Sequence, residues 1–352
     1  MKVLITGGAG YIGSHACVEF LSAGYNLSVI DNLSNSKVEA LRRVEKIANK
    51  SITFHKVDLL DYDALENVFK IEYDIGGVIH FAGLKAVGES LSVPLKYYQN
   101  NITGTVNLCA LMNKYNIKNL VFSSSATVYG NPIKTPITED FPLHVTNPYG
   151  QTKLTIETML KDLYKSDPAW NISILRYFNT VGAHKSGLIG EDPRGTPNNL
   201  MPYITQVAIG KRDRLIVFGN DFATKDGTGI RDYIHVMDLA QGHLNAFKML
   251  LTSPGLIVHN LGTGTGHSVL DMIQVFEKAT GKVVPYTIMK RRDGDIGECY
   301  ANVLKAKTEL GFTVKNELYE MCEDSWRWQK NNPDGYEVKN IKEHPRKPFS
   351  DN

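Results

Sequence analysis

The chain has 352 residues, 42% hydrophobic and 22% charged, a composition typical of a soluble globular protein with one large core or two moderate ones. Its 39 basic against 37 acidic residues give a net charge of +2, which argues against nucleic acid or an anionic membrane as a partner. The four cysteines lack Cys-x-x-Cys spacing and no apolar run is long enough for a membrane helix, so we expect a cytoplasmic protein without a bound metal.

Six short apolar runs, rich in β-branched residues, predict strands in the first half of the chain, and helical patterns separate them. This alternation is typical of parallel βαβ units. It predicts a doubly wound α/β (Rossmann) fold of strand order 3-2-1-4-5-6, with the ligand beyond the carboxyl ends of the strands. The runs are Val3–Thr6, Leu27–Asp31, Ile52–Asp58, Gly77–Phe81, Asn119–Ser123 and Asn171–Arg176.

A glycine-rich loop, Gly7 to Gly13, follows the first strand and opens a helix. In such a loop one glycine makes a tight turn, another lets a pyrophosphate approach the helix N-terminus, and a third allows close packing of helix on strand. Asp31 ends the second strand, where a carboxylate can bind a ribose 2′-hydroxyl. Together these features predict a site for NAD rather than NADP.

Tyr149 and Lys153 lie four residues apart near the start of a predicted amphipathic helix, and Ser125 ends the preceding strand. A lysine ammonium can stabilise the phenolate of a neighbouring tyrosine. The tyrosine pKa must fall by about three units, about 4 kcal/mol, for the phenolate to act as a base at neutral pH. Tyr286 and Lys290 repeat the spacing in a strand-like run, which would hold them apart.

The second half of the chain is less regular, with recurring Gly, Pro and Asn. We expect an NAD-binding domain over 1–180 and a smaller α/β substrate lobe over 181–345, with part of 230–262 returning to the first domain. A second glycine cluster, Gly262–Gly266, lacks the third glycine spacing and the downstream acid. We interpret it as a turn near the cleft between the lobes.

These motifs, with three further segments, resemble the UDP-glucose 4-epimerases, a family of extended short-chain dehydrogenases/reductases. The segments are His80–Ser90, Ser123–Gly130 and Arg231–His235. The resemblance implies reversible C4 epimerisation of UDP-glucose and UDP-galactose through a 4-keto sugar and tightly bound NAD. It implies that Tyr149 is the base, that Lys153 holds the nicotinamide ribose and tunes Tyr149, and that Ser125 relays the proton.

The resemblance also assigns residues to the two ligands. For NAD they are Gly7, Gly10, Tyr11, Ile12, Asp31, Asn32, Asn35, Ser36, Asp58, Leu59, Phe81, Ala82, Gly83, Lys85, Asn100, Ser125, Tyr149, Lys153 and Phe178. For the UDP-sugar they are Asn179, Asn199, Leu200, Phe218, Arg231, Tyr233, Arg292, Asp295 and Cys299. The two arginines suit a diphosphate because guanidinium groups bind such oxygens in pairs.

Two finer expectations follow from the same resemblance. Cys299 would wall the sugar pocket, and its small side chain would leave room for the acetamido group of UDP-N-acetylglucosamine and UDP-N-acetylgalactosamine, unless Tyr300 refills the space. A homodimer would form through helices near Tyr97–Tyr115 and Tyr149–Tyr164, unless their apolar faces pack only inside the monomer.

Three other functions would explain part of this pattern. A sugar-nucleotide 4,6-dehydratase would carry an Asp-Glu pair where Ala126 and Thr127 stand, and neither can eliminate water by acid–base chemistry. A non-catalytic NAD sensor would tend to lose the Tyr149–Lys153 pair. A net-oxidising dehydrogenase needs an exchangeable cofactor, and the residues alone leave that open.

Overall fold

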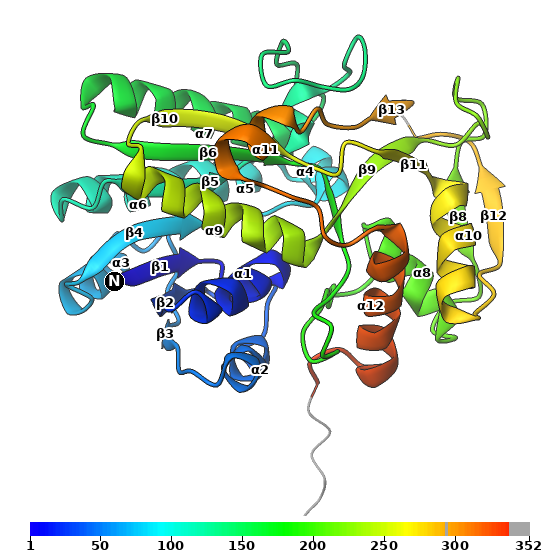
Figure 1. Cartoon of the computed structure of the whole chain (residues 1–352), viewed down its shortest axis with the longest axis horizontal. Helices are drawn as coiled ribbons and strands as arrows, with labels where there is room; N and C mark the ends of the chain where they lie inside the picture. The colour runs from blue at the N-terminus through cyan, green and yellow to red at the C-terminus, as the bar shows by residue number, and fades with distance from the viewer. Residues whose placement is uncertain (293–294, 338–352) are drawn as a thin grey trace, which may run out of the picture.

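The computed structural model describes residues 1–292 and 295–337. Within these residues the largest feature is a seven-stranded, wholly parallel sheet of order β10-β6-β5-β4-β1-β2-β3 (Figure 1). The first six strands along the chain, β1 to β6, lie in the predicted order 3-2-1-4-5-6, which confirms the doubly wound α/β class. The strands are β1 (Lys2–Thr6), β2 (Asn26–Ile30), β3 (Thr53–His55), β4 (Ile75–His80), β5 (Asn119–Ser123), β6 (Asn171–Tyr177) and β10 (Leu256–Leu261).

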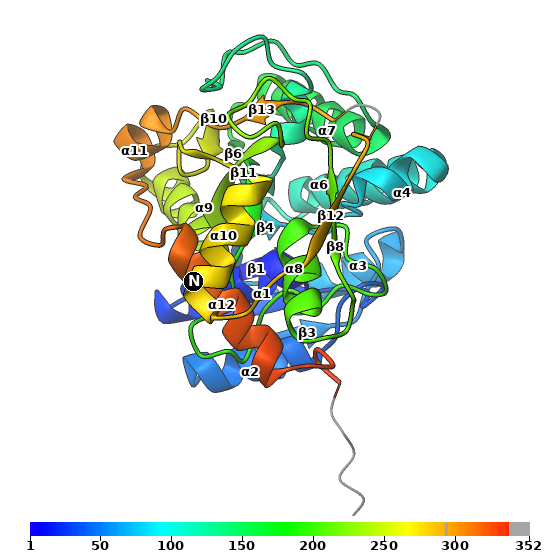
Figure 2. The same cartoon turned by 90° about the vertical axis from the view of Figure 1, so that its right-hand side faces the viewer.

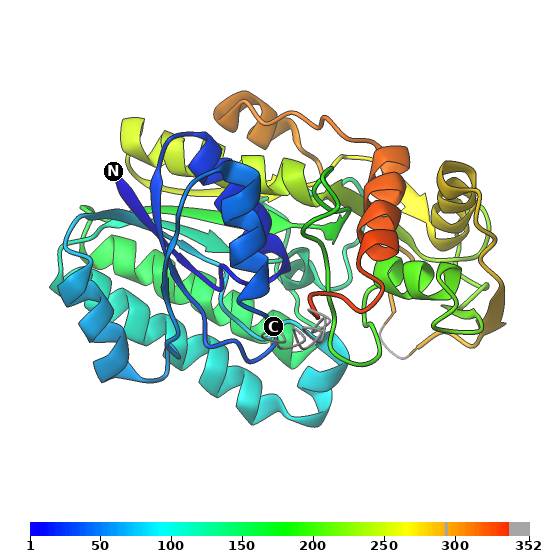
Figure 3. The ribbon, with the colours of Figure 1, turned by 90° about the horizontal axis from the view of Figure 1, so that it is seen from below.

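Alternating side chains of the sheet fill two cores on its opposite faces, as β1 illustrates. Val3 and Ile5 join the core beneath one layer of helices, and Leu4 joins the core beneath the other. Figures 1 and 3 show the two layers. The first contains α1 (Tyr11–Ser22), α2 (Glu39–Ala48), α9 (Val236–Thr252) and α11 (Leu304–Leu310); the second contains α3 (Tyr62–Ile71), α6 (Gly104–Lys114) and α7 (Pro148–Ser166).

Two predicted elements differ from those observed. The third strand, expected over Ile52–Asp58, keeps only Thr53–His55, because the Asp58 carboxylate bonds Asn32 and the backbone of Leu60 and so belongs to a loop. The helix expected around Tyr97–Tyr115 is not one α-helix, because a π-helical segment (Tyr98–Thr103) joins α5 (Pro94–Tyr97) to α6. A separate helix, α4 (Val87–Ser92), precedes them.

A second lobe lies beyond the carboxyl ends of the large sheet, at the right of Figure 1 and in front in Figure 2. In it β9 pairs with β7, β11 and β13, and β12 pairs with β8. Its core includes Ile204, Tyr233, Phe276 and Met321. The elements are β7 (Asn179–Val181), α8 (Leu200–Ala208), β8 (Leu215–Phe218), β9 (Ile230–His235), β11 (Gly266–Ser268), α10 (Val269–Thr280), β12 (Tyr286–Met289), β13 (Glu298–Cys299) and α12 (Leu318–Asn331).

The chain crosses between the lobes more than once, because α9 and β10 return to the first sheet after β9. In the second glycine cluster, the N–H groups of Thr263 and Gly264 donate to the buried Asp232 carboxylate, as a structural turn requires. The domain boundary near residue 180 stays a prediction, and residues 338–345 of the expected second lobe lie outside the described residues. Of the helices described, none is long and apolar enough to cross a membrane.

Candidate active site

A cleft of about 750 Å³ lies at the carboxyl ends of the parallel strands, where a doubly wound fold places its ligand. Loops after β1, β2 and β4, the start of α7, and residues 190–198 of the second lobe line it. Of the residues expected at the cofactor, all but Ser125 and Phe178 belong to this lining. The residues expected at the UDP-sugar lie elsewhere, in the second lobe and its approaches.

The glycines of the first loop occupy positions that a larger residue would disturb. Gly7 has a φ of +70°, and a Cβ there would lie 2.7 Å from the Ala82 nitrogen. A Cβ on Gly13 would lie 2.2 Å from the Gly7 carbonyl oxygen, so this glycine lets α1 start against the loop. Gly10 caps α1 in an extended conformation, which leaves the helix N-terminus facing the cleft.

Asp31 follows β2, and its carboxylate is fixed at the same cleft. It accepts hydrogen bonds from the Ala9 nitrogen at 3.1 Å, the Leu33 nitrogen at 2.9 Å and Ser36 Oγ at 2.8 Å. The side chain is nearly buried. The backbone therefore presents an oriented carboxylate beside the glycine loop, which suits recognition of a ribose diol.

Tyr149, Lys153 and Ser125 meet at the edge of this cleft. The N-cap Asn147 accepts from the Gly150 nitrogen at 2.8 Å, which fixes the start of α7 and with it Tyr149. Lys153, one turn later, donates to the Ser123 carbonyl at 2.8 Å, and its Nζ lies 6.0 Å from the centroid of the Tyr149 ring. The Ser125 side chain lies close enough to the Tyr149 phenol to lower the pKa of that group.

Burial shifts the pKa values of both Tyr149 and Lys153 in the protein without ligands. Burial raises the pKa of Tyr149 to about 12, and the neighbouring Ser125 side chain opposes that rise. Burial lowers the pKa of Lys153 to about 8, and the Glu157 carboxylate opposes that fall. A neutral-pH phenolate therefore needs a further positive charge near Tyr149.

Sequence reasoning missed several residues of the cleft. Asn101, in the π-helical segment, accepts from the Leu84 nitrogen at 2.8 Å and donates to Thr152 Oγ1 at 3.0 Å, which ties the loop after β4 to α7. Glu191 and Asp192 of the second lobe pair with Lys85 and Lys37, each at 3.1 Å. No local motif marks these positions, since the fold alone brings them to the cleft.

Most residues expected at the UDP-sugar sit on paired strands or at helix ends. Asn179 and Tyr233 are partners on β7 and β9, and Arg231 and Cys299 are partners on β9 and β13. Asn199 caps α8 ahead of Leu200, and it donates to Glu191 at 2.7 Å. Pairing thus brings together residues that are far apart in sequence.

The two arginines are already bonded to the protein. Arg292 binds Asp295 through two hydrogen bonds of 2.9 and 3.1 Å, and its guanidinium lies 4.8 Å from the Phe218 ring. Arg231 donates to the carbonyls of Ile230 and Gly297 at 2.8 and 3.4 Å. Both guanidinium groups are therefore held in place by bonds that a diphosphate could replace.

Cys299 packs in a small apolar cluster with Ala126, Ile137 and Phe178. Burial raises the pKa of its thiol to about 11, so it is a neutral, compact group. The ring of Tyr300 lies near Gly266, where an added Cβ would be 3.1 Å from Tyr300 Cδ1. That this ring leaves the space beside Cys299 free stays a prediction.

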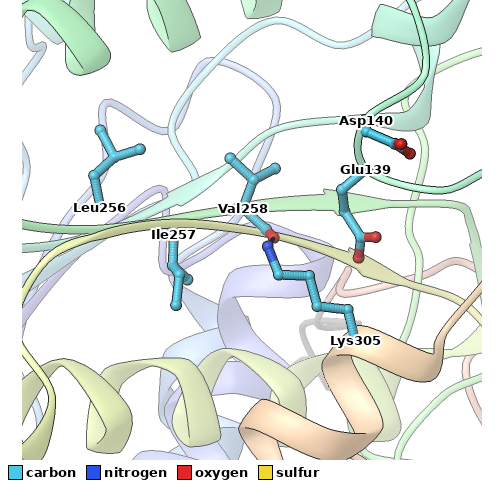
Figure 4. A pocket seen from close by; sticks show the side chains of 6 residues that line it. All are labelled: Glu139, Asp140, Leu256, Ile257, Val258 and Lys305. Carbon is cyan, nitrogen blue, oxygen red and sulfur yellow. Dashed lines mark hydrogen bonds between the residues drawn. The ribbon is translucent and has the colours of Figure 1, made fainter.

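A second cavity, of about 420 Å³, lies at the outer edge of β10 (Figure 4). Leu256 and Val258 project to one side of the strand and Ile257 to the other. Lys305 of α11 donates to the Val258 carbonyl at 2.9 Å, and the Glu139 carboxylate accepts from the Asn260 nitrogen at 2.8 Å. These bonds cap polar groups of an edge strand, which protects it from pairing with other chains.

Known proteins share this fold and much of the sequence. Residues 4–325 match the family model described as GDP-mannose 4,6 dehydratase. The chain is 62% identical to the UDP-glucose 4-epimerase of Bacillus subtilis over 336 residues, which cover 96% of this chain and 99% of that protein. The human UDP-glucose 4-epimerase is 56% identical over 342 residues, which cover 95% and 98%. The chain belongs to the UDP-glucose 4-epimerase family.

Solved members of the UDP-glucose 4-epimerase family have the same architecture. The Bifidobacterium longum enzyme, crystallised with NAD⁺ and UDP, matches with a TM-score of 0.91 and 49% identity over 95% of this chain and all of that one. The names of these relatives describe epimerases, which are isomerases. The dehydratase alternative also finds no acid at Ala126–Tyr129, which forms one short 3₁₀ turn.

Proposed function

We propose that this member of the family interconverts UDP-glucose and UDP-galactose through a 4-keto sugar, with NAD held in the cleft. One observation carries the proposal: Tyr149, Lys153 and Ser125 converge at the edge of the cleft that the glycine loop and Asp31 line. A phenol that can become a base stands beside a dinucleotide cradle, as an enzyme that oxidises and reduces the same carbon requires.

The cradle fits NAD on steric and chemical grounds. Gly7 and Gly13 have no room for a side chain, and Asp31 presents a fixed carboxylate to a diol. NAD bound there would accept a hydride from C4, return it to the other face, and add the positive charge that the Tyr149 phenol needs. The net reaction then consumes no oxidant.

The residues of the chain handle the proton. Tyr149 takes the proton of the 4-hydroxyl and returns it to the same oxygen after the 4-keto sugar has turned over. Ser125 lies beside the phenol and is placed to orient the reacting hydroxyl. The Lys153 ammonium stabilises the phenolate, and the Ser123 carbonyl fixes its position.

The UDP group is proposed to bind in the second lobe. Arg231 and Arg292 would take the diphosphate, with Arg292 exchanging its bonds to Asp295 for bonds to phosphate oxygens. The other residues proposed for the UDP-sugar are Asn179, Asn199, Leu200, Phe218 and Tyr233.

We also propose that the enzyme epimerises N-acetylated UDP-hexosamines. The thiol of Cys299 is small and buried among apolar side chains, and Tyr300 is directed toward Gly266. A pocket with this wall has room for a group that a phenol ring in place of Cys299 would exclude.

A homodimer is a further proposal. Val87, Leu91 and Leu95 of α4 and α5 and Val106 of α6 are exposed apolar side chains on the side of the sheet that carries α7. These side chains lie on or beside the expected contact helices, Tyr97–Tyr115 and Tyr149–Tyr164, and a dimer formed there would remove their apolar surface from water. Light scattering of the pure protein measures the assembly, and a mass of one chain at micromolar concentration would refute the dimer.

The decisive experiment adds UDP-galactose to pure protein without cofactor and follows the sugar signals by NMR. Appearance of UDP-glucose, with NAD released on denaturation, supports the proposal. A requirement for stoichiometric free NAD, or loss of NAD on dialysis, would favour a net-oxidising dehydrogenase instead. The same assay with UDP-N-acetylgalactosamine tests the wider specificity, which an inert mixture at high substrate would refute.

A further inference from the structure

Glu157 is a buried carboxylate beneath the catalytic residues. Its side chain has no exposed surface, and it accepts two bonds from Arg176 Nε, at 3.0 and 3.2 Å, and one from Nη2 at 2.6 Å. Ser124 Oγ donates to the same carboxylate at 2.6 Å. A carboxylate that accepts four hydrogen bonds is fixed in one position.

The position of Glu157 links both segments that carry catalytic groups. Tyr149, Lys153 and Glu157 follow one another at intervals of four residues, so they share one face of α7. Ser124 stands between Ser123, whose carbonyl binds Lys153, and Ser125, which lies close to Tyr149. The carboxylate therefore joins the end of β5 to the catalytic helix.

Lys153 needs a negative charge near it. Its side chain is buried, and its hydrogen bond goes to the Ser123 carbonyl, a neutral acceptor. Burial lowers the pKa of Lys153 to about 8, and the charge that opposes this fall is that of Glu157. Without such a charge, a buried ammonium loses its proton at lower pH.

The other titratable groups around the pair do not replace Glu157. Burial lowers the pKa of His80 to about 3 and that of His243 to about 4, so both are neutral at physiological pH. The groups around Lys153 and Glu157 are His80 of β4, Tyr97 of α5, Tyr129 of the 3₁₀ turn, Arg176 and Tyr177 of β6, and His243 of α9, with Tyr149 and Lys161 on α7 itself. Burial raises the pKa of Tyr129 to about 12, so this phenol is also neutral at physiological pH.

We propose that Glu157 is a positioning residue for the epimerase reaction: held by Arg176 and Ser124, it supplies the negative charge that balances the Lys153 ammonium. The inference rests on the proposed roles of Tyr149 and Lys153. A purely structural pair would only join α7 to β6. It would change the stability of the protein and leave the pH dependence of turnover as it is.

The test is the pH profile of kcat for UDP-galactose in Glu157→Gln, which keeps the shape of the side chain and removes its charge. Lys153 then loses its proton at lower pH, so we expect the alkaline limb to move down by about one pH unit. Asp162→Asn, which removes an exposed acid from the same helix, is the matched control and leaves the limb in place. Ser124→Ala keeps the charge, so its alkaline limb also stays in place.

Glu157→Gln leaves Arg176 as a buried cation without its carboxylate, which destabilises the fold. The double variant Glu157→Gln/Arg176→Met removes the repulsion between Arg176 and Lys153 together with the attraction from Glu157, so we expect a smaller shift in the same direction. UDP affinity and the melting temperature report whether each variant is folded. An alkaline limb that stays at the wild-type pH in a folded variant overturns the inference. A limb unaffected by Lys153→Met would instead refute the proposed role of Lys153.

Discussion

All but two of the residues expected at the cofactor line one cleft, whereas those expected at the UDP-sugar are spread over β7, α8, β8, β9, β13 and the loops between them. The cofactor half is built from glycine backbone and strand ends, which local sequence specifies. The sugar half is built from side chains that bind one another, such as Arg292 and Asp295. A sugar nucleotide bound as proposed would exchange bonds that the protein already makes, whereas the glycine backbone of the cofactor cleft is already in place, beside the ion pairs Lys85–Glu191 and Lys37–Asp192.

Replacing Tyr149 removes the proposed base and leaves the residues expected at the cofactor and at the UDP-sugar unchanged. We expect Tyr149→Phe to lower kcat by about 10²-fold or more, because the proton transfer is lost while the ring still packs. UDP affinity, measured by calorimetry, should change little. An unchanged kcat would remove Tyr149 from the mechanism.

Removing the ammonium tests the electrostatics of the cofactor side. Since a positive charge favours the phenolate, Lys153→Met raises the apparent pKa of the base, and the acid limb of the kcat profile moves up by about one to three units. Lys165→Met, at an exposed lysine of the same helix, serves as the control. A profile identical to wild type would assign the tuning to another charge.

A larger residue at position 299 tests the specificity for the sugar and does not change the residues expected at the cofactor. We expect Cys299→Tyr to lower kcat/KM for UDP-N-acetylgalactosamine by about 10- to 100-fold and to spare UDP-galactose, because only the acetamido group needs the space. Cys299→Ser, of nearly the same size, should retain both activities. Equal losses on both substrates would mean that the ring disturbs the fold rather than the specificity.

We expect the smallest effect from replacing Arg292, which is proposed to exchange its bonds to Asp295 for bonds to the diphosphate. We expect Arg292→Gln to raise KM for UDP-galactose about tenfold with little change in kcat, because a charged bond to the diphosphate is lost in both ground and transition state. The neighbouring Arg291 pairs with Asp221, so Arg291→Gln is the matched control. A fall in kcat without a rise in KM would contradict a binding role.

The same contrast explains how much the sequence could predict. The six strands, the glycine loop, Asp31 and the Tyr149–Lys153 helix follow from local patterns, and each is observed. Asn101 was missed because a π-helical segment within a helical pattern has no turn residue to mark it. The position of Cys299 beside Arg231 depends on the pairing of β13 with β9, which no local pattern specifies.

The late return of β10 bears on how the protein is made. Until residues 256–261 have been synthesised, β6 is an edge strand with unpaired backbone groups. The helix α9, which covers Val121 and Leu175, also comes late in the chain. The nascent first lobe thus leaves the ribosome with an open sheet edge and with one face covered only in part, by α1 and α2, a state that invites aggregation. A fragment ending near residue 180 would keep that state, so we expect the two lobes to fold together.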